Sequence, residues 1–193
     1  FEDGLKLVRL RSEAMQMACD NVESTMAAVI GLEDDDVEGV CGRSDKGVVV
    51  AANFNAPGQV VISGDVAAVK QAMQKAKNNG AKMAKQLEVN GAFHSPLMEP
   101  ARHDLAQAIQ DVEFSEPAAP IYQNATAEGT TDPDTLKRNL VVQLTAPVRW
   151  RQSIEQMIRD GATDFIELGP GKVLQGLVKR IDRSVSIAGY EAP

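Results

Sequence analysis

The sequence is poor in aromatic residues and has no excess of basic ones. Aromatic side chains make up 4% of its 193 residues, and 20 Lys and Arg stand against 27 Asp and Glu, so the formal net charge is −7. Proteins that bind nucleic acids typically carry a basic face, and those that bind single strands stack the bases on aromatic side chains. The composition therefore disfavours both classes.

Cysteine is also scarce, since the chain has only Cys19 and Cys41. Two cysteines are too few for a disulfide scaffold, and no C-x-x-C motif or Cys/His cluster is available to bind a metal. We expect both residues to act as small apolar side chains in a reducing compartment, with the cytoplasm as the location. We expect no metal site.

Long apolar runs are missing as well. No run approaches the roughly 18 residues that a membrane-spanning helix requires, and no basic segment followed by an apolar stretch marks a secretory signal. We therefore expect no membrane association. The chain starts at Phe1 without an initiator methionine and inside a segment of helical spacing, so we expect an upstream piece to belong to the protein.

The first half of the chain predicts a helix followed by a small α+β unit. Apolar groups at Leu7, Val8, Met15 and Ala18 recur at helical spacing, which predicts a helix over the first 19 residues. Residues 25–89 predict the order strand, helix, strand, strand, helix, strand, which is typical of a ferredoxin-like unit with a four-stranded antiparallel sheet and both helices on one face. The segments are a strand at 25–31, a helix within 32–43, a hairpin over 47–64 that turns at 55–58, a helix capped by Asp65 and ended by Gly80, and a strand at 81–89.

After residue 90, strands alternate with helices, which favours a parallel α/β sheet. Helices are predicted to begin near Met98, Asp134, Pro147 and Lys172. The predicted strands are 121–124, a buried strand at 163–168, and 184–189.

The position of the antiparallel unit, between one helix and this α/β half, predicts an insertion. We predict a ferredoxin-like α+β subdomain over residues 23–90 inserted into an α/β core formed by residues 1–22 and 91–193. Three strands are few for such a core, which agrees with the expectation that the protein has a further segment upstream of Phe1.

Two side chains stand out as candidates for chemistry. His94 lies in a loop between Gly91 and Pro96, at the junction of the two units. Such junctions form clefts and histidine is the usual general base, so His94 is either catalytic or a plain surface residue. Arg11 lies beside the apolar stripe of the first helix, where its guanidinium could bind a carboxylate or its stem could simply cover the surface. His103 is interpreted as a surface residue.

Other motifs are weaker. Gly169-Pro170-Gly171-Lys172 follows a strand and precedes a helix, so it could bind an anion, but it is not a P-loop and a tight turn is the favoured interpretation. The nucleophile elbow G-x-S-x-G is absent from the sequence. Asn53 and Asn55 are interpreted either as residues lining the interface between the units or as part of the hairpin.

Several segments together resemble the malonyl-CoA:acyl-carrier-protein transacylases of bacterial fatty-acid synthesis, in the portion downstream of the nucleophile. They occur in family order and span essentially the whole chain: VRLRSEAMQMA, MAAVIGL, NFNAPGQVVISG, AFHSPLM, VVQLTAPVRW and IELGPGKVLQGLVKRI. The resemblance implies an α/β-hydrolase-like core, incomplete here, with the ferredoxin-like subdomain inserted in it.

The resemblance also implies the reaction and its residues. A serine in G-H-S-x-G, expected just upstream of Phe1, takes the malonyl group from CoA and passes it to the phosphopantetheine thiol of the carrier protein. His94 corresponds to the catalytic histidine, Gln143 to the residue whose main-chain carbonyl orients it, and Arg11 to the arginine that pairs with the malonyl carboxylate. We expect the 193 residues alone to be inactive, because they hold this His and Arg but no nucleophile.

The expected partners are malonyl-CoA and the acyl carrier protein, with no further cofactor and a monomeric chain. Because carrier proteins are acidic, the basic candidates for docking are Lys82, Lys85, Lys172, Lys179 and Arg180. Two alternatives stay open: a non-catalytic protein-binding module, which would explain the missing nucleophile, and a transacylase-like domain of a polyketide synthase.

Overall fold

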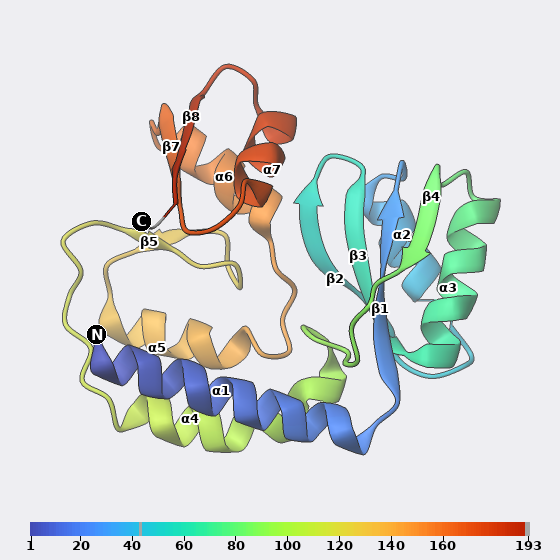
Figure 1. Cartoon of the computed structure of the whole chain (residues 1–193), viewed down its shortest axis with the longest axis horizontal. Coiled ribbons are helices and arrows are strands. Elements are labelled where there is room, and N and C mark those ends of the chain that lie inside the picture. Colours follow the sequence, from blue (N-terminus) through green and yellow to red (C-terminus); the bar gives the residue numbers. More distant parts are fainter. Residues whose placement is uncertain (43, 192–193) are drawn as a thin grey trace.

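Helices and strands alternate along the described residues, 1–42 and 44–191, of this computed structural model (Figure 1). The first element is a long helix, α1 (Glu2–Asn21), which confirms the helix predicted at the start of the chain. None of the helices in the described ranges combines the length and the apolar character that crossing a bilayer requires.

The next part of the chain forms a four-stranded antiparallel sheet with the strand order β2-β3-β1-β4. Its elements are β1 (Ser24–Ile30), α2 (Asp34–Cys41), β2 (Val49–Ala56), β3 (Gln59–Asp65), α3 (Val66–Asn78) and β4 (Met83–Gln86). This confirms the element order predicted for residues 25–89. The last strand is shorter than the predicted 81–89.

The two faces of this sheet bury different groups. One face packs under α2 and α3 and forms the largest core cluster, to which the strands contribute Ala27, Val29, Phe54, Val60 and Ile62. Met26, Ala52 and Val61 form a smaller cluster with Leu87 and Phe93. Because neighbouring side chains of a strand point to opposite faces, this second cluster lies on the side away from the helices.

Asp65 precedes α3 as predicted, but it does not cap the helix through its side chain. Its carboxylate accepts a hydrogen bond of 2.7 Å from the amide of Val48. Gly47 has a positive φ of 119°, and a Cβ there would lie 2.4 Å from that carboxylate. The carboxylate therefore fixes the entry to β2, a contact that the local sequence pattern does not reveal.

A layer of helices lies below the sheets in Figure 1, where α1, α4 and α5 run alongside one another. It contains the 3-10 turn η1 (Pro96–Ala101), α4 (Arg102–Gln110) and α5 (Pro133–Val142). The buried residues at their contacts are Ala14, Met15, Ala18, Met98, Leu105, Ile109 and Leu144. The helical spacing places Val8 in this stripe, but its side chain is 62% exposed, because the described residues leave that end of the helix face uncovered.

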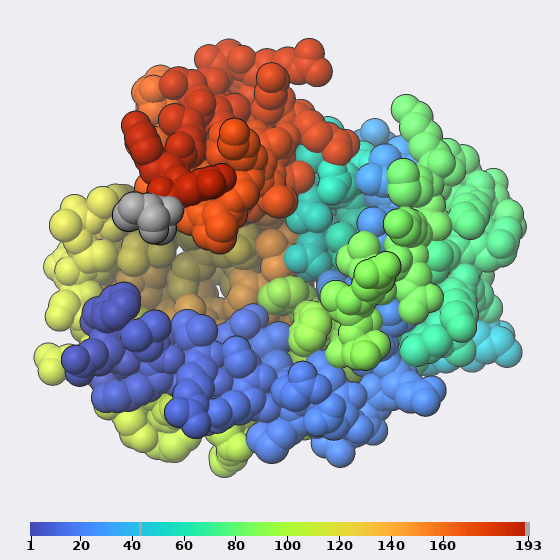
Figure 2. All heavy atoms as spheres, in the orientation of Figure 1, coloured from blue at the N-terminus to red at the C-terminus, as the bar shows by residue number. Residues whose placement is uncertain are grey.

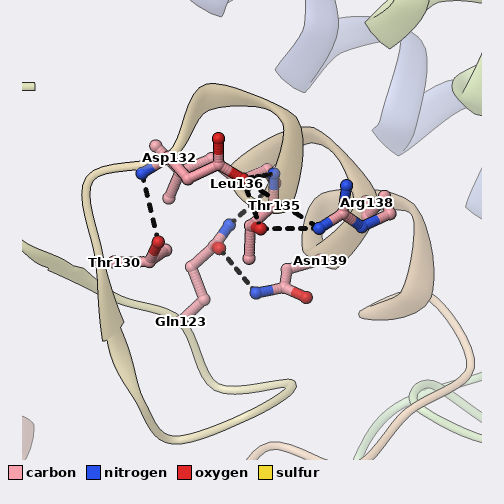
Figure 3. Close-up of polar contacts among 7 residues, drawn as sticks. All are labelled: Gln123, Thr130, Asp132, Thr135, Leu136, Arg138 and Asn139. Carbon is pink, nitrogen blue, oxygen red and sulfur yellow. Dashed lines mark hydrogen bonds and ion pairs between the residues drawn. The ribbon is translucent and has the colours of Figure 1, made fainter. Parts of the chain in front are cut away.

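Side-chain hydrogen bonds hold the loop before α5 (Figure 3). The carboxylate of Asp132 accepts from the amide of Thr135 at 2.8 Å, which caps the helix. The amide of Gln123 donates to the carbonyl of Leu136 at 3.1 Å, and Asn139 donates to the Gln123 side chain at 3.0 Å. These bonds fix α5, whose last residue precedes Gln143.

The remaining elements form a unit at the top of Figure 1: α6 (Trp150–Arg159), β7 (Asp164–Leu168), α7 (Val173–Ile181) and β8 (Ser186–Tyr190). The face of the molecule in Figure 2 is hollowed between α1 and this unit. Strands β7 and β8 pair in parallel, which confirms the parallel pairing predicted for these two segments.

Two expectations about this half are wrong. The strand at 121 does not join β7 and β8, because β5 (Ile121–Tyr122) pairs antiparallel with β6 (Gly129–Thr130) after a turn with a positive φ at Ala127. The strand β7 is not buried, since Ile166 is 58% and Leu168 is 79% exposed. Its sheet has two strands in the described residues, and these two side chains lie uncovered.

Residue Val148 joins the C-terminal unit to the edge strand β2. Its amide donates to the carbonyl of Ala52 and its carbonyl accepts from the amide of Phe54, both at 2.8 Å. A half-buried ion pair of 2.8 Å between Arg151 and Asp34 lies at the same junction. The chain around residue 148 is therefore fixed to the antiparallel sheet.

The core of the antiparallel sheet should dominate stability. Ile62 in β3 is fully buried, so Ile62→Ala should lower the free energy of unfolding by about 2–5 kcal/mol, through lost burial and a new cavity. Urea unfolding followed by circular dichroism measures this change. Ile166→Ala, on the exposed face of β7, is the matched control and should change stability by less than about 0.5 kcal/mol. Equal losses in both variants would contradict the assignment of the core.

Candidate active site

A cavity of about 590 Å³ lies where α1, the antiparallel sheet and the loop before η1 meet. Its lining residues are Arg11, Ser12, Met15, Gln16, Met26, Asn53, Asn55, Val61, Leu87, Phe93 and His94. The face of the sheet that lacks helices forms its apolar wall. The structure thus brings together Arg11 and His94, two of the three predicted site residues, and the third, Gln143, contacts His94.

The ring of His94 is held by a main-chain group. Its Nδ1 lies 3.0 Å from the carbonyl oxygen of Gln143. A carbonyl oxygen can only accept a hydrogen bond, so Nδ1 carries the proton and the lone pair of the neutral ring is on Nε2. This is the tautomer that a general base acting through Nε2 requires.

The loop that carries His94 is fixed in an unusual conformation. His94 has a positive φ of 58°, which few residues other than glycine adopt. Ser95, which is fully buried, donates from its hydroxyl to the carbonyl of Ala92 at 2.6 Å. Gly91 passes so close to α1 that a Cβ there would lie 2.4 Å from the sulfur of Cys19. Such strain persists where the surroundings enforce it, and it is concentrated at functional sites.

The surroundings of His94 favour its neutral form. Burial is the main cause that lowers the pKa of His94 below the ordinary 6.5, and the positive charge of Arg11 lowers it further. Hydrogen bonds to the carbonyls of Gln143 and Ala146 act in the opposite direction. Burial thus favours the uncharged imidazole, which is the form that can accept a proton.

Arg11 is a cation that has no partner among the residues that the structure describes. Burial lowers the pKa of its guanidinium, which nevertheless stays charged in proteins. None of the ion pairs or side-chain hydrogen bonds within the described part of the chain uses it. A half-buried cation that faces a cavity and lacks a counter-ion is suited to bind an anion, and the planar guanidinium fits a carboxylate.

The Gly169–Lys172 motif does not form an anion site. Gly169 and Gly171 have positive φ values of 127° and 86°, as in a tight turn. The carboxylate of Glu167 already accepts hydrogen bonds from the amides of Leu174 and Gln175, at 3.1 and 3.2 Å. The turn interpretation is confirmed, and the start of α7 is occupied by this side chain of the protein itself.

Sequence reasoning missed several residues that shape the site. Ser95 could have been found as a serine before a proline at a helix start, where it accepts from the amide of Leu97. The carbonyl of Ala146 and the apolar wall carry no local signal. Asn53 and Asn55 both line the cavity, as one of the two interpretations expected. His103 is exposed on α4, as predicted.

The described residues that line the cavity do not provide a serine nucleophile. Ser12 lines it, but its hydroxyl donates to the carbonyl of Val8 at 3.0 Å within α1. No G-x-S-x-G motif occurs in the sequence. The cavity therefore has a candidate base and a candidate anion site without the nucleophile that such a base would activate.

Comparison with known proteins gives the class of the chain. Residues 1–190 match the model of the acyl transferase domain, so the chain belongs to this family.

The chain can also be compared with individual members of this family. The malonyl CoA-acyl carrier protein transacylase of Staphylococcus aureus (strain MRSA252) is 41% identical over 99% of this chain and 63% of its own length. The crystal structure of the acyl-carrier-protein S-malonyltransferase of Burkholderia pseudomallei 1710b superposes with a TM-score of 0.95 at 44% identity, over 100% of this chain and 63% of that chain. A malonyl-transacylase solved with a type II PKS acyl-carrier protein gives a TM-score of 0.92 at 36% identity, over 97% and 61%. The chain spans a little under two thirds of the length of these relatives.

The positive charge of Arg11 should have a measurable effect on the titration midpoint of His94. With two histidines in the chain, a proton–carbon NMR titration can follow both rings, and His103→Asn assigns the signals. We expect His94 to titrate below 6.5 and its midpoint to rise in Arg11→Met, because the variant removes a nearby positive charge. Arg9→Met, which removes an exposed arginine paired with Glu13, is the control and should leave the midpoint in place. Equal shifts in both variants would contradict the proximity of Arg11 to the ring.

Proposed function

We propose that this chain carries the general base and the carboxylate-binding arginine of a malonyl-CoA:acyl-carrier-protein transacylase of fatty-acid synthesis. The observation that carries the proposal is that a strained, carbonyl-oriented histidine and an unpaired arginine face one cavity. A module that only docks another protein has no need of such a pair. The names of the relatives support the substrate and the reaction.

The proposal also concerns the division of the chain into domains. We propose that residues 23–90 are a ferredoxin-like subdomain inserted into an α/β-hydrolase-like core formed by residues 1–22 and 91–193. The sheet order β2-β3-β1-β4 and the parallel pair β7-β8 support this division.

In the proposed reaction His94 moves a proton twice. A serine from the G-H-S-x-G segment of this family attacks the malonyl thioester, while Nε2 of His94 accepts the hydroxyl proton. The carbon–sulfur bond to CoA then breaks, and the proton passes from Nε2 to the leaving thiolate. In the second half Nε2 accepts the thiol proton of the carrier protein's phosphopantetheine while the sulfur attacks the malonyl ester. The bond between the acyl carbon and the serine oxygen then breaks, and His94 passes this proton to the serine oxygen. The carbonyl of Gln143 holds the ring in both directions.

Arg11 supplies the selectivity for a dicarboxylic acyl group. Its guanidinium would form two parallel hydrogen bonds with the free carboxylate of the malonyl group. Because the guanidinium has no other partner in the described residues, the malonyl carboxylate does not have to displace an internal anion.

The substrates need no further cofactor in this proposal, and the chain acts as a monomer in the cytoplasm. The acidic carrier protein would dock on exposed basic side chains. The candidates Lys82, Lys85, Lys172, Lys179 and Arg180 are all exposed, and Arg180 contacts the side chain of Gln59 on the antiparallel sheet.

Removal of the base should reduce turnover strongly. The test joins this chain to the residues that precede the matched region in the Staphylococcus aureus relative, so that a nucleophile is present. His94→Ala should then lower kcat by about 10²–10⁴-fold, the usual contribution of general acid–base catalysis. Malonyl transfer to the carrier protein, followed by intact mass, measures the rate, and His103→Ala serves as the control. Near-normal transfer by His94→Ala would remove it from the mechanism.

The second variant tests selectivity in the same joined protein. Arg11→Ala should lower kcat/KM for malonyl-CoA by about 10–100-fold, because a charge-assisted pair contributes about 1.5–3 kcal/mol. Acetyl transfer should stay unchanged or improve, since acetyl lacks the carboxylate. Arg11→Lys should rescue only partly, because an ammonium cannot bind both oxygens in the same way. If Arg11→Ala lowers kcat/KM for malonyl-CoA and for acetyl-CoA by the same factor, while Arg9→Ala lowers neither value, the role of Arg11 is structural.

A further inference from the structure

We propose that the side-chain amide of Gln143 is a positioning group, which locks the turn 143–147 so that the main-chain carbonyl of Gln143 is held against His94. The effect on catalysis rests on the proposed function, but the geometry does not. The main-chain carbonyl of Gln143 orients the ring, and the side chain of the same residue fixes that carbonyl.

Both hydrogens of this amide are used within the turn. Nε2 of Gln143 donates to the carbonyl of Ala146 at 2.9 Å and to the carbonyl of Pro147 at 3.2 Å. The carbonyls of Gln143 and Ala146 are also the two that raise the pKa of His94 through hydrogen bonding. The side chain of Gln143 thus closes the turn that begins at its own carbonyl, and this carbonyl lies 3.0 Å from Nδ1 of His94.

The turn lies between two fixed points. On one side the main-chain amide of Gln143 donates to the carbonyl of Asn139 at 2.9 Å, where α5 ends. On the other side Val148 pairs with β2 in both directions. The Gln143 side chain bridges the residues between these points. Without its two bonds the carbonyls at 146 and 147, both part-buried, would lose a donor and the turn could open.

The test compares two glutamines that donate to main-chain carbonyls. Gln143→Met keeps the length of the side chain and the main-chain acceptor but removes both donors. Gln123→Met is the matched control, because Gln123 donates to the carbonyl of Leu136 in α5 (Figure 3) and neither residue lines the cavity. The nitrogen chemical shifts of the His94 ring report which nitrogen carries the proton, and a pH titration reports its midpoint.

We expect the unaltered chain and Gln123→Met to show a single tautomer protonated at Nδ1. In Gln143→Met we expect a mixture of tautomers and a lower midpoint, since weaker carbonyl contacts no longer offset burial. If Gln143→Met keeps the single tautomer, or if both variants change it equally, the side chain is not a positioning group and the proposal fails.

Two further measurements keep the test decisive. If Gln143→Met does not fold, Gln143→Leu replaces it, because this uncharged side chain likewise cannot donate to the two carbonyls. In the unaltered chain the amide protons of the Gln143 side chain should exchange slowly with solvent, and fast exchange would overturn the proposal.

A measurement of transfer activity separates this inference from the proposed function. In the joined protein Gln143→Met should lower kcat by about 10-fold or more with little change in KM, because small misplacements of a catalytic group are costly. A changed tautomer with no transfer activity in the unaltered joined protein would contradict the proposed function alone. An unchanged tautomer in an active enzyme would contradict this inference alone.

Discussion

The hydrogen bond between His94 Nδ1 and the carbonyl of Gln143 is the constraint on which the site depends. It joins the loop that follows the antiparallel sheet to the residue that follows α5. Its acceptor is a neutral main-chain group, so it orients the ring without adding a negative charge to the cavity. A carboxylate in the same place would raise the pKa of His94 and would compete for Arg11. The neutral acceptor therefore favours an uncharged imidazole and leaves Arg11 without a competing anion among the described residues.

The rest of the fold holds the two ends of this hydrogen bond in place. Gly91 allows the loop to pass against Cys19 of α1, and buried Ser95 fixes the conformation of His94 from within the loop. On the other side, Val148 extends the edge of the antiparallel sheet by one residue. The sheet thus has two roles: one face forms its own core with α2 and α3, and the other face is a wall of the cavity.

Local patterns predicted the antiparallel unit well, because its hairpin and helices are encoded by nearby turn residues and apolar spacing. They failed where distant partners decide the outcome. Asp65 binds the amide of Val48 instead of capping α3, β6 pairs with β5 through a turn that carries no strong signal, and Ile166 in β7 lacks the cover that its apolar character suggested. His94 and Arg11 were plausible by residue type, but only the resemblance to a family assigned them roles. Their common cavity is a property of the three-dimensional structure.

A structure of this chain with a non-hydrolysable malonyl thioester analogue tests the central claim most directly, because it locates both ends of the acyl group at once. The account predicts the free carboxylate on the guanidinium of Arg11 and the carbonyl carbon on the His94 side of the same cavity, with the contact between His94 and Gln143 intact. A ligand bound with its carboxylate away from Arg11, or bound outside the cavity that Arg11 and His94 line, would contradict the account.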